Sequence, residues 1–133
     1  MSVGVLLITH DGLGRDLIDT AGAMLGASPL AMQALEVSQA DEPDEVVETA
    51  HQRLRELDEG LGVLVLTDAY GSTPSNIAQR LAADARVVVV AGVNLPMLIR
   101  VLNYPRLSLA EMAEKAVSGG RDGIVPYHED TGP

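Results

Sequence analysis

Two residues with reactive side chains each stand two positions after an apolar run of the sequence. His10 follows the run 3–8, and Asp68 follows the run 63–66. An imidazole is neutral and nucleophilic near pH 7, and a phosphoryl group on one of its nitrogens remains a good leaving group. A carboxylate bonded to the other nitrogen fixes the tautomer and supports the positive charge that develops on attack. If the two side chains meet, they predict reversible phosphoryl transfer through His10, with Nδ1 facing Asp68 and Nε2 as the acceptor.

The segment after Asp68 has the composition of an anion-binding turn. Gly71, Ser72 and Thr73 supply backbone amides and two hydroxyls, and Pro74 suits the start of a helix because it has no amide proton to lose. Thr73 is therefore expected to be the N-cap, and the amides of residues 71–73 are expected to bind the phosphoryl oxygens. Three further residues are expected to line the same crevice: Thr9, Tyr70 and Asn94.

These residues need a scaffold that brings two strand ends together. Apolar runs predict buried strands at residues 3–8, 63–66 and 87–91. A further short strand is predicted at residues 32–37, where Gln33 and Glu36 break the apolar run, as expected nearer a sheet edge. Helical spacing of apolar residues predicts helices over residues 12–27, 43–57, 74–82, 96–102 and 108–118. The alternation predicts an α/β fold with a doubly wound, flavodoxin-like parallel sheet in the order 2-1-3-4. In that order the first and third strands are neighbours, so His10 and Asp68 are expected to meet at the switch point.

The C-terminal part of the chain is less regular. Gly119 and Gly120 are expected to end the last helix, and residues 122–127 to form a short final strand. That strand could pair antiparallel at the sheet edge or be exchanged with another subunit, and the spacing leaves both open. Residues 128–133 are expected to be a flexible polar tail. In the first helix, the expected buried stripe comprises Leu17, Ile18, Ala21, Met24 and Leu25.

Composition limits the class of protein. The 133 residues match one domain, and the net charge of −10 disfavours nucleic acid and anionic membranes but favours basic partner surfaces. There is no cysteine, and three widely spaced histidines show no metal-ligand pattern, so no metal or other cofactor is expected. No apolar run approaches the roughly 18 residues needed to span a bilayer, and the N-terminus lacks a secretion signal. We therefore expect one cytoplasmic domain over residues 1–133.

Three motifs resemble one known family. They are VLLITH at residues 5–10, TDAYGSTPSN at residues 67–76 and AGVNLPML at residues 91–98. In this order and spacing they are similar to the mannose-type IIA component of the bacterial phosphoenolpyruvate:sugar phosphotransferase system, over nearly the whole chain. Two positions differ, because the family commonly has tryptophan at Tyr70 and glycine at Ser72.

The resemblance implies that His10 accepts a phosphoryl group from the phosphohistidine of the phosphocarrier HPr and passes it to a IIB component, and that Asp68 orients His10. It also implies a flavodoxin-like fold and a homodimer that exchanges a C-terminal strand, for which residues 122–127 are the candidate. The chain ends without a IIB or membrane domain, so the expected role is either one member of a sugar transport set or a regulatory relay.

Three other classes are weighed against this one. A receiver-like signalling module would be phosphorylated on Asp68, but it needs paired acids for magnesium after the first strand, and only Asp11 follows His10 there. A dihydroxyacetone-kinase phosphotransfer subunit begins with a similar domain, although the middle motif is closer to the sugar type. A flavodoxin-like binding protein is the third, and three tyrosines as the only aromatic residues argue against a flavin site.

Overall fold

Four parallel strands form the sheet at the centre of the molecule. The computed structural model describes residues 1–129, so most of the predicted tail, residues 128–133, lies outside the described residues. The strands are β1 (Gly4–His10), β2 (Met32–Val37), β3 (Val63–Thr67) and β4 (Val87–Ala91). They lie in the order β2-β1-β3-β4, so the predicted order 2-1-3-4 is confirmed.

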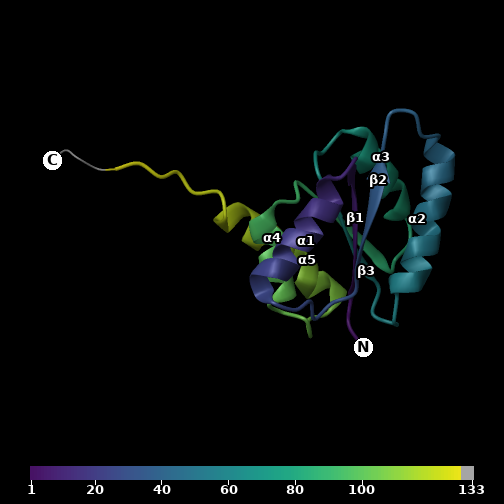
Figure 1. The fold of residues 1–133 in the computed structure, drawn as a ribbon. Helices are drawn as coiled ribbons and strands as arrows, with labels where there is room; N and C mark the ends of the chain where they lie inside the picture. The colour runs from purple at the N-terminus through teal and green to yellow at the C-terminus, as the bar shows by residue number, and fades with distance from the viewer. Residues whose placement is uncertain (130–133) are drawn as a thin grey trace.

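Helices cover both faces of this sheet (Figure 1). They are α1 (Leu13–Leu25), α2 (Pro43–Leu57), α3 (Thr73–Leu81), α4 (Leu95–Leu102) and α5 (Leu109–Asp122). Helices α2 and α3 bury one face, and α1, α4 and α5 bury the other. Along β1, Leu6 and Ile8 pack toward α2 and α3, whereas Val5 and Leu7 pack toward the opposite layer. Two covered faces explain why β4 and most of β1 and β3 are apolar, whereas the edge strand β2 carries Gln33 and Glu36.

None of the helices within residues 1–129 is both long and apolar enough to cross a membrane.

The buried stripe of helix α1 differs from its prediction at one position. Gly26 is the C-cap of this helix, with a left-handed φ of 76°. Ala21 is fully buried and Leu25 packs against the same core. The spacing places Met24 on this stripe too, but its side chain is 62% exposed, because Met24 lies at the margin of a stripe centred between Ala21 and Leu25.

Helix α5 runs past Gly119 and Gly120, where the sequence predicts its end. Glycine serves packing here, since a Cβ on Gly119 would lie 2.4 Å from the Cβ of Arg100 in α4. The helix continues to Asp122, so the prediction of a strand beginning at this residue is wrong. The rest of the segment 122–127 forms no strand within the described part of this chain and extends away from the body of the fold (Figure 1).

Asp58 connects the end of α2 to the turn that enters β3. Its Oδ1 accepts hydrogen bonds from the amides of Gly60 and Gly62 at 2.8 and 3.1 Å, and Arg86 Nε donates to its Oδ2 at 2.6 Å. The hydrogen bond from the Arg86 guanidinium is the main reason why the pKa of Asp58 lies well below its usual range. Burial opposes this shift, and the two glycine amides add to it.

Replacement of Asp58 by alanine is expected to lower the free energy of unfolding at neutral pH by about 1–3 kcal/mol, because charge-assisted hydrogen bonds are lost. A carboxyl group whose pKa is lowered by folding stabilises the protein fully above its unfolded pKa of about 4, and this effect is lost as the pH falls further toward the folded pKa. Acidification should therefore destabilise the wild type more steeply than Asp58→Ala.

Urea unfolding at neutral pH and at about pH 3 measures both effects. Asp44→Ala is the matched control, because Asp44 forms an exposed ion pair with Arg80 at 3.0 Å. Loss of such a pair is expected to change the free energy of unfolding by less than about 1 kcal/mol. An equal dependence on pH in the wild type and in Asp58→Ala would contradict the prediction.

Candidate active site

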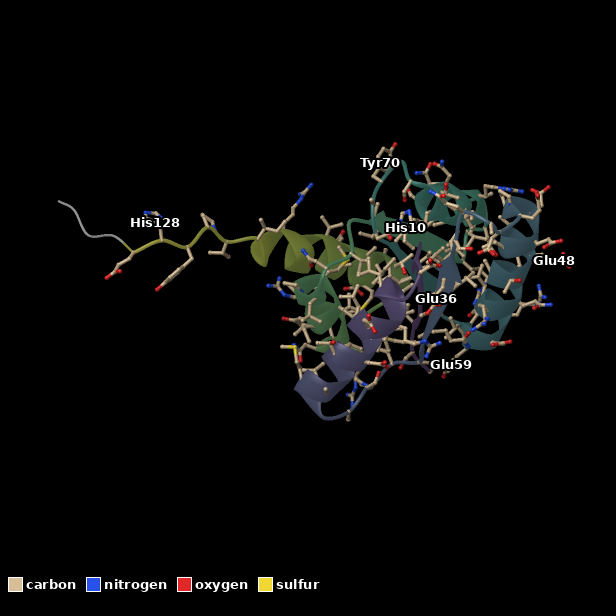
Figure 2. All side chains as sticks on the ribbon, turned by 45° about the horizontal axis from the view of Figure 1, so that its top comes forward. His10, Glu36, Glu48, Glu59, Tyr70 and His128 are labelled. Atoms are coloured by element: carbon tan, nitrogen blue, oxygen red, sulfur yellow. The ribbon has the colours of Figure 1, made fainter. Side chains whose placement is uncertain are left out.

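His10 is the last residue of β1 and lies beyond the end of β3. The register between these strands stops at the pair Ile8 and Thr67, so β1 extends two residues past its neighbour. Side chains alternate along a strand, which places His10 on the face of Ile8, toward α3. Its side chain is 58% exposed, and in the view of Figure 2 it lies below the loop that carries Tyr70. The imidazole is therefore accessible to another protein.

Asp68 binds both the backbone and the ring of His10. Its Oδ2 accepts a hydrogen bond from the His10 amide at 2.9 Å and lies 2.7 Å from His10 Nδ1. Its Oδ1 accepts a hydrogen bond from the Ala69 amide at 2.8 Å. Burial raises the pKa of Asp68, but the hydrogen bonds from His10 and Ala69 together outweigh burial, and the pKa lies below its usual value. The carboxylate is thus ionised at neutral pH.

The ionised carboxylate determines which ring nitrogen of His10 is free. A carboxylate can only accept hydrogen bonds, so the short contact to Nδ1 requires the proton to be on that nitrogen. In the neutral imidazole, Nε2 then keeps its lone pair. The sequence prediction that His10 and Asp68 meet across two neighbouring strands therefore agrees with the geometry, with Nδ1 facing the acid.

The loop at residues 71–73 differs from its prediction in two ways. The N-cap of α3 is Ser72 and not Thr73, because the Ser72 side chain accepts from the Ser75 amide. In addition, two of the expected amides have acceptors inside the loop: the Gly71 amide donates to Ser75 Oγ at 3.4 Å and the Ser72 amide donates to the Ala69 carbonyl at 3.1 Å. Thr73, as the first residue of α3, has an amide without an acceptor in the helix. It also carries a hydroxyl, so among residues 71–73 Thr73 keeps donors that the hydrogen bonds within the loop do not use.

Backbone conformation explains the residue types in this loop. Gly71 has φ of 88°, in the left-handed region that favours glycine. Ser72 has φ of −78° and ψ of 170°, an extended conformation that any residue adopts. Its hydroxyl donates to the Ala69 carbonyl at 2.6 Å. Serine at this position is therefore compatible with the loop and caps α3.

The three residues expected to line the crevice have different environments. Thr9 is fully buried toward α1 and does not line it. Tyr70 is 81% exposed and stands clear of the ribbon in Figure 2. Asn94 caps α4, since its Oδ1 accepts from the Met97 amide at 2.9 Å and its Nδ2 donates to the Gly120 carbonyl at 3.2 Å. It lines a separate cavity of about 370 Å³ between β4, α4 and α5.

Sequence reasoning missed two contributors to the site. Ala69 contributes only its amide, so its side chain carries no signal. Ser75 is fully buried and accepts the Gly71 amide. A polar residue on the otherwise apolar buried face of α3 is a signal that the sequence does contain.

Known proteins share this sequence and fold. Residues 4–117 match the model of a family described as the PTS system fructose IIA component, where PTS denotes the phosphotransferase system. The chain is 31% identical over 127 residues to the mannose-specific EIIAB component of Escherichia coli strain K12. This match covers 93% of the chain but 39% of the relative, so the chain spans about two fifths of that protein's length.

Two solved structures have a similar fold. The mannose/sorbose-specific IIA subunit from Enterococcus faecalis superposes with a TM-score of 0.85 and 21% identity, over 100% of both chains. The PTS IIA protein associated with the fucose utilization operon from Streptococcus pneumoniae gives a TM-score of 0.77 and 23% identity, over 95% of this chain and 96% of that one. At these identities the likeness concerns the fold. The family match over residues 4–117 and the relative at 31% identity show that the chain belongs to the IIA components of the mannose/fructose family of the phosphotransferase system.

Proposed function

We propose that His10 accepts a phosphoryl group from the phosphohistidine of HPr and donates it to a IIB component. The observation that carries the proposal is the 2.7 Å contact between His10 Nδ1 and Asp68 Oδ2 on an imidazole that is more than half exposed. In the first step the Nε2 lone pair attacks phosphorus, the N–P bond of the donor breaks, and its electron pair returns to the donor imidazole. Asp68 accepts the hydrogen bond from Nδ1–H, so the proton stays on Nδ1, and the negative charge of Asp68 balances the positive charge that develops on the ring. In the second step, a nucleophile of the IIB component attacks the same phosphorus, the bond between phosphorus and Nε2 breaks, and its electron pair returns to the His10 imidazole.

Donors for the transferred group lie at the start of α3. The Thr73 amide and hydroxyl, together with the positive end of the helix dipole, are suited to the phosphoryl oxygens. These donors are held by the capped first turn of α3, so they need little reorganisation as negative charge moves. We therefore assign phosphate binding chiefly to Thr73, with Gly71 and Ser72 shaping the loop.

A basic donor surface fits the charge of this protein. The net charge is −10, and a groove of about 360 Å³ beside the carboxyl end of β2 is lined by four acidic residues. They are Glu36, Asp41, Glu42 and Glu45. Val37 of β2 is the register partner of His10, so this groove belongs to the same end of the sheet as the imidazole. Acidic groups there favour rapid association with a basic HPr face in the cytoplasm.

Incubation with phosphoenolpyruvate, enzyme I and HPr tests the relay. We expect one phosphate for each chain, labile in acid and stable in alkali, as for a phosphohistidine. An acid-stable phosphate, or one released by alkali as for an aspartyl phosphate, would overturn the assignment to His10. The receiver-like alternative predicts an aspartyl phosphate on Asp68. It is disfavoured because both oxygens of Asp68 already accept hydrogen bonds from His10 and Ala69.

A second copy of this chain is the proposed partner of the β4 edge. Beside β4 runs an open, largely apolar groove of about 630 Å³ between the strand and α5. The opposite edge strand, β2, is flanked by polar contacts, with Arg15 near Glu36 and Arg53 bonded to Gln33. Such contacts discourage strand pairing. The segment after α5 exposes three large apolar side chains that suit the groove of a partner: Ile124, Val125 and Tyr127.

Substitution of Val125 by aspartate is expected to convert a dimer into a monomer, because a charge would enter the apolar groove of the partner. Light scattering after size-exclusion chromatography gives the mass. Met24→Asp is the control, since Met24 is an exposed apolar residue on α1 and is expected to leave the mass unchanged. A wild-type chain that is monomeric at high micromolar concentration, or a Val125→Asp variant that stays dimeric, would exclude this pairing.

A further inference from the structure

The peptide groups at the end of β1 lack a strand partner on one side. Pairing with β3 stops at Ile8, so the two residues that follow lie beyond the ladder. Backbone N–H and C=O groups need acceptors and donors. The N–H of His10 donates to Asp68 Oδ2 at 2.9 Å. The carbonyl oxygen of His10 accepts from Thr9 Oγ1, also at 2.9 Å. Two side chains therefore replace the ladder around the residue that carries the imidazole.

A second contact determines how the Thr9 hydroxyl is oriented. The amide of Gly14 in α1 donates to Thr9 Oγ1 at 2.8 Å, in a buried position. A hydroxyl has a single proton to donate, and the Gly14 amide approaches the oxygen as a donor. The proton of Thr9 is thus directed to the carbonyl of His10. Thr9 itself is fully buried, so solvent does not compete for this hydroxyl.

The closeness of α1 to this hydroxyl favours glycine at position 14. A Cβ there would lie 3.0 Å from Thr9 Oγ1 and 3.2 Å from Leu7 Cβ, which is tighter than ordinary side-chain contacts. The Gly14 amide in the first turn of α1 therefore fixes the Thr9 hydroxyl, and this hydroxyl in turn donates to the His10 carbonyl. In contrast, a Cβ on Gly22 of the same helix would meet nothing within 4 Å.

We infer that Thr9 is a positioning residue for phosphoryl transfer, which acts through the His10 carbonyl and is itself held by the Gly14 amide. The inference rests on the proposed function of His10. Asp68 and Thr9 hold the N–H and the C=O of the same residue, so together they set the direction in which Nε2 points. Loss of the Thr9 hydroxyl frees the His10 carbonyl and lets the imidazole turn away from the line of attack. Misplacement of a reacting atom by about 1 Å can cost about a hundredfold in rate.

Thr9→Val and Thr9→Ser separate this role from packing. Valine keeps the shape of threonine but removes the hydroxyl, whereas serine keeps the hydroxyl. We expect Thr9→Val to slow phosphorylation by phospho-HPr about tenfold at saturating donor, with little change in the donor concentration at half-maximal rate. Thr9→Ser should stay within about threefold of the wild type. A folded Thr9→Val protein with the wild-type rate would overturn the inference.

Gly14→Ala tests the contact from the side of the helix. Alanine has the higher helix propensity, so this variant is expected to fold even if Thr9→Val does not. Its Cβ pushes against Thr9 Oγ1, and we expect slower transfer without loss of thermal stability. Gly22→Ala makes the same exchange in open space and is the matched control, with an unchanged rate. Equal rates in the two variants would contradict a role for the Gly14 contact.

The proton resonance of His10 Nδ1 provides a readout that does not depend on the relay. In the free protein, the hydrogen bond to Asp68 should shift this resonance downfield. Thr9→Val should move it toward the position of an unbonded imidazole, whereas Thr9→Ser should not. An unchanged resonance in Thr9→Val would overturn the positioning role even if the relay is correct. A wild type that takes no phosphate from phospho-HPr would instead overturn the relay, and the resonance would still decide whether Thr9 orients the ring.

Discussion

Replacement of His10 by alanine is expected to abolish phosphate incorporation from phospho-HPr. The only nucleophile proposed at this site is Nε2 of His10, whose partner nitrogen is held by Asp68 at 2.7 Å. We do not expect Asp68 to take its place, because both oxygens of Asp68 accept hydrogen bonds from backbone amides. The loss should therefore be complete within the sensitivity of a radiolabel or intact-mass measurement, not a partial reduction in rate.

The fold of this variant should be preserved. The His10 side chain is 58% exposed and belongs to neither core cluster, so we expect a change in the free energy of unfolding of about 1 kcal/mol or less. His51→Ala is the matched control, since His51 is exposed on α2 and is expected to keep full phosphate incorporation. Stoichiometric phosphate on a folded His10→Ala protein would exclude the proposed relay.

Asp68→Asn is expected to slow phosphoryl transfer by about a hundredfold or more while the protein remains folded. The carboxylate accepts three N–H groups, from the His10 backbone, the His10 ring and the Ala69 backbone. An amide has only one oxygen acceptor, so one or more of these donors loses its partner. The ring then loses both its fixed tautomer and the negative charge that stabilises the phosphorylated imidazole. In serine proteases a comparable loss of tautomer control costs about 10⁴ in rate.

Rapid-quench measurement of single-turnover transfer from phospho-HPr provides the test. Because hydrogen bonds hold the pKa of Asp68 below its usual value, the carboxylate stays ionised from neutral pH down past the ordinary range of an aspartate. The defect of Asp68→Asn should therefore be nearly constant between about pH 6 and pH 8. Asp11→Asn removes the same charge next to His10 and is the matched control, with no slowing expected. An Asp68→Asn rate within about twofold of the wild type would exclude the orienting role.

The sheet and the central pair of the site were predictable from the sequence for one physical reason. Strands covered on both faces must be apolar along their whole length, so the runs that form β1 and β3 stand out, and each is followed by its polar residue. Parallel strands present their carboxyl ends at one edge, and the order 2-1-3-4 makes β1 and β3 neighbours. His10 and Asp68 consequently meet at the carboxyl ends of these two neighbouring strands.

Local patterns failed where a particular contact in the folded structure made the decision. The Gly119-Gly120 pair resembles a helix end, but in α5 it allows close packing on α4 at Arg100, so the helix continues. Thr73 precedes Pro74 and resembles an N-cap, but the N-cap is Ser72, because its hydroxyl accepts the hydrogen bond from the Ser75 amide. In both cases the residue type is explained, yet its role depends on which group lies opposite it in space.

The sequence by itself determined the fold class, the strand order, the charge and the histidine–aspartate pair at the centre of the candidate site, because these follow from burial, periodicity and side-chain chemistry. Only the tertiary structure decided which loop donors remain available and that Thr9 faces α1 instead of the crevice. These features depend on which partner each polar group faces in the folded structure and on distances of a few tenths of an ångström. A one-dimensional pattern does not encode such distances, whereas a packed core holds each group against one particular partner.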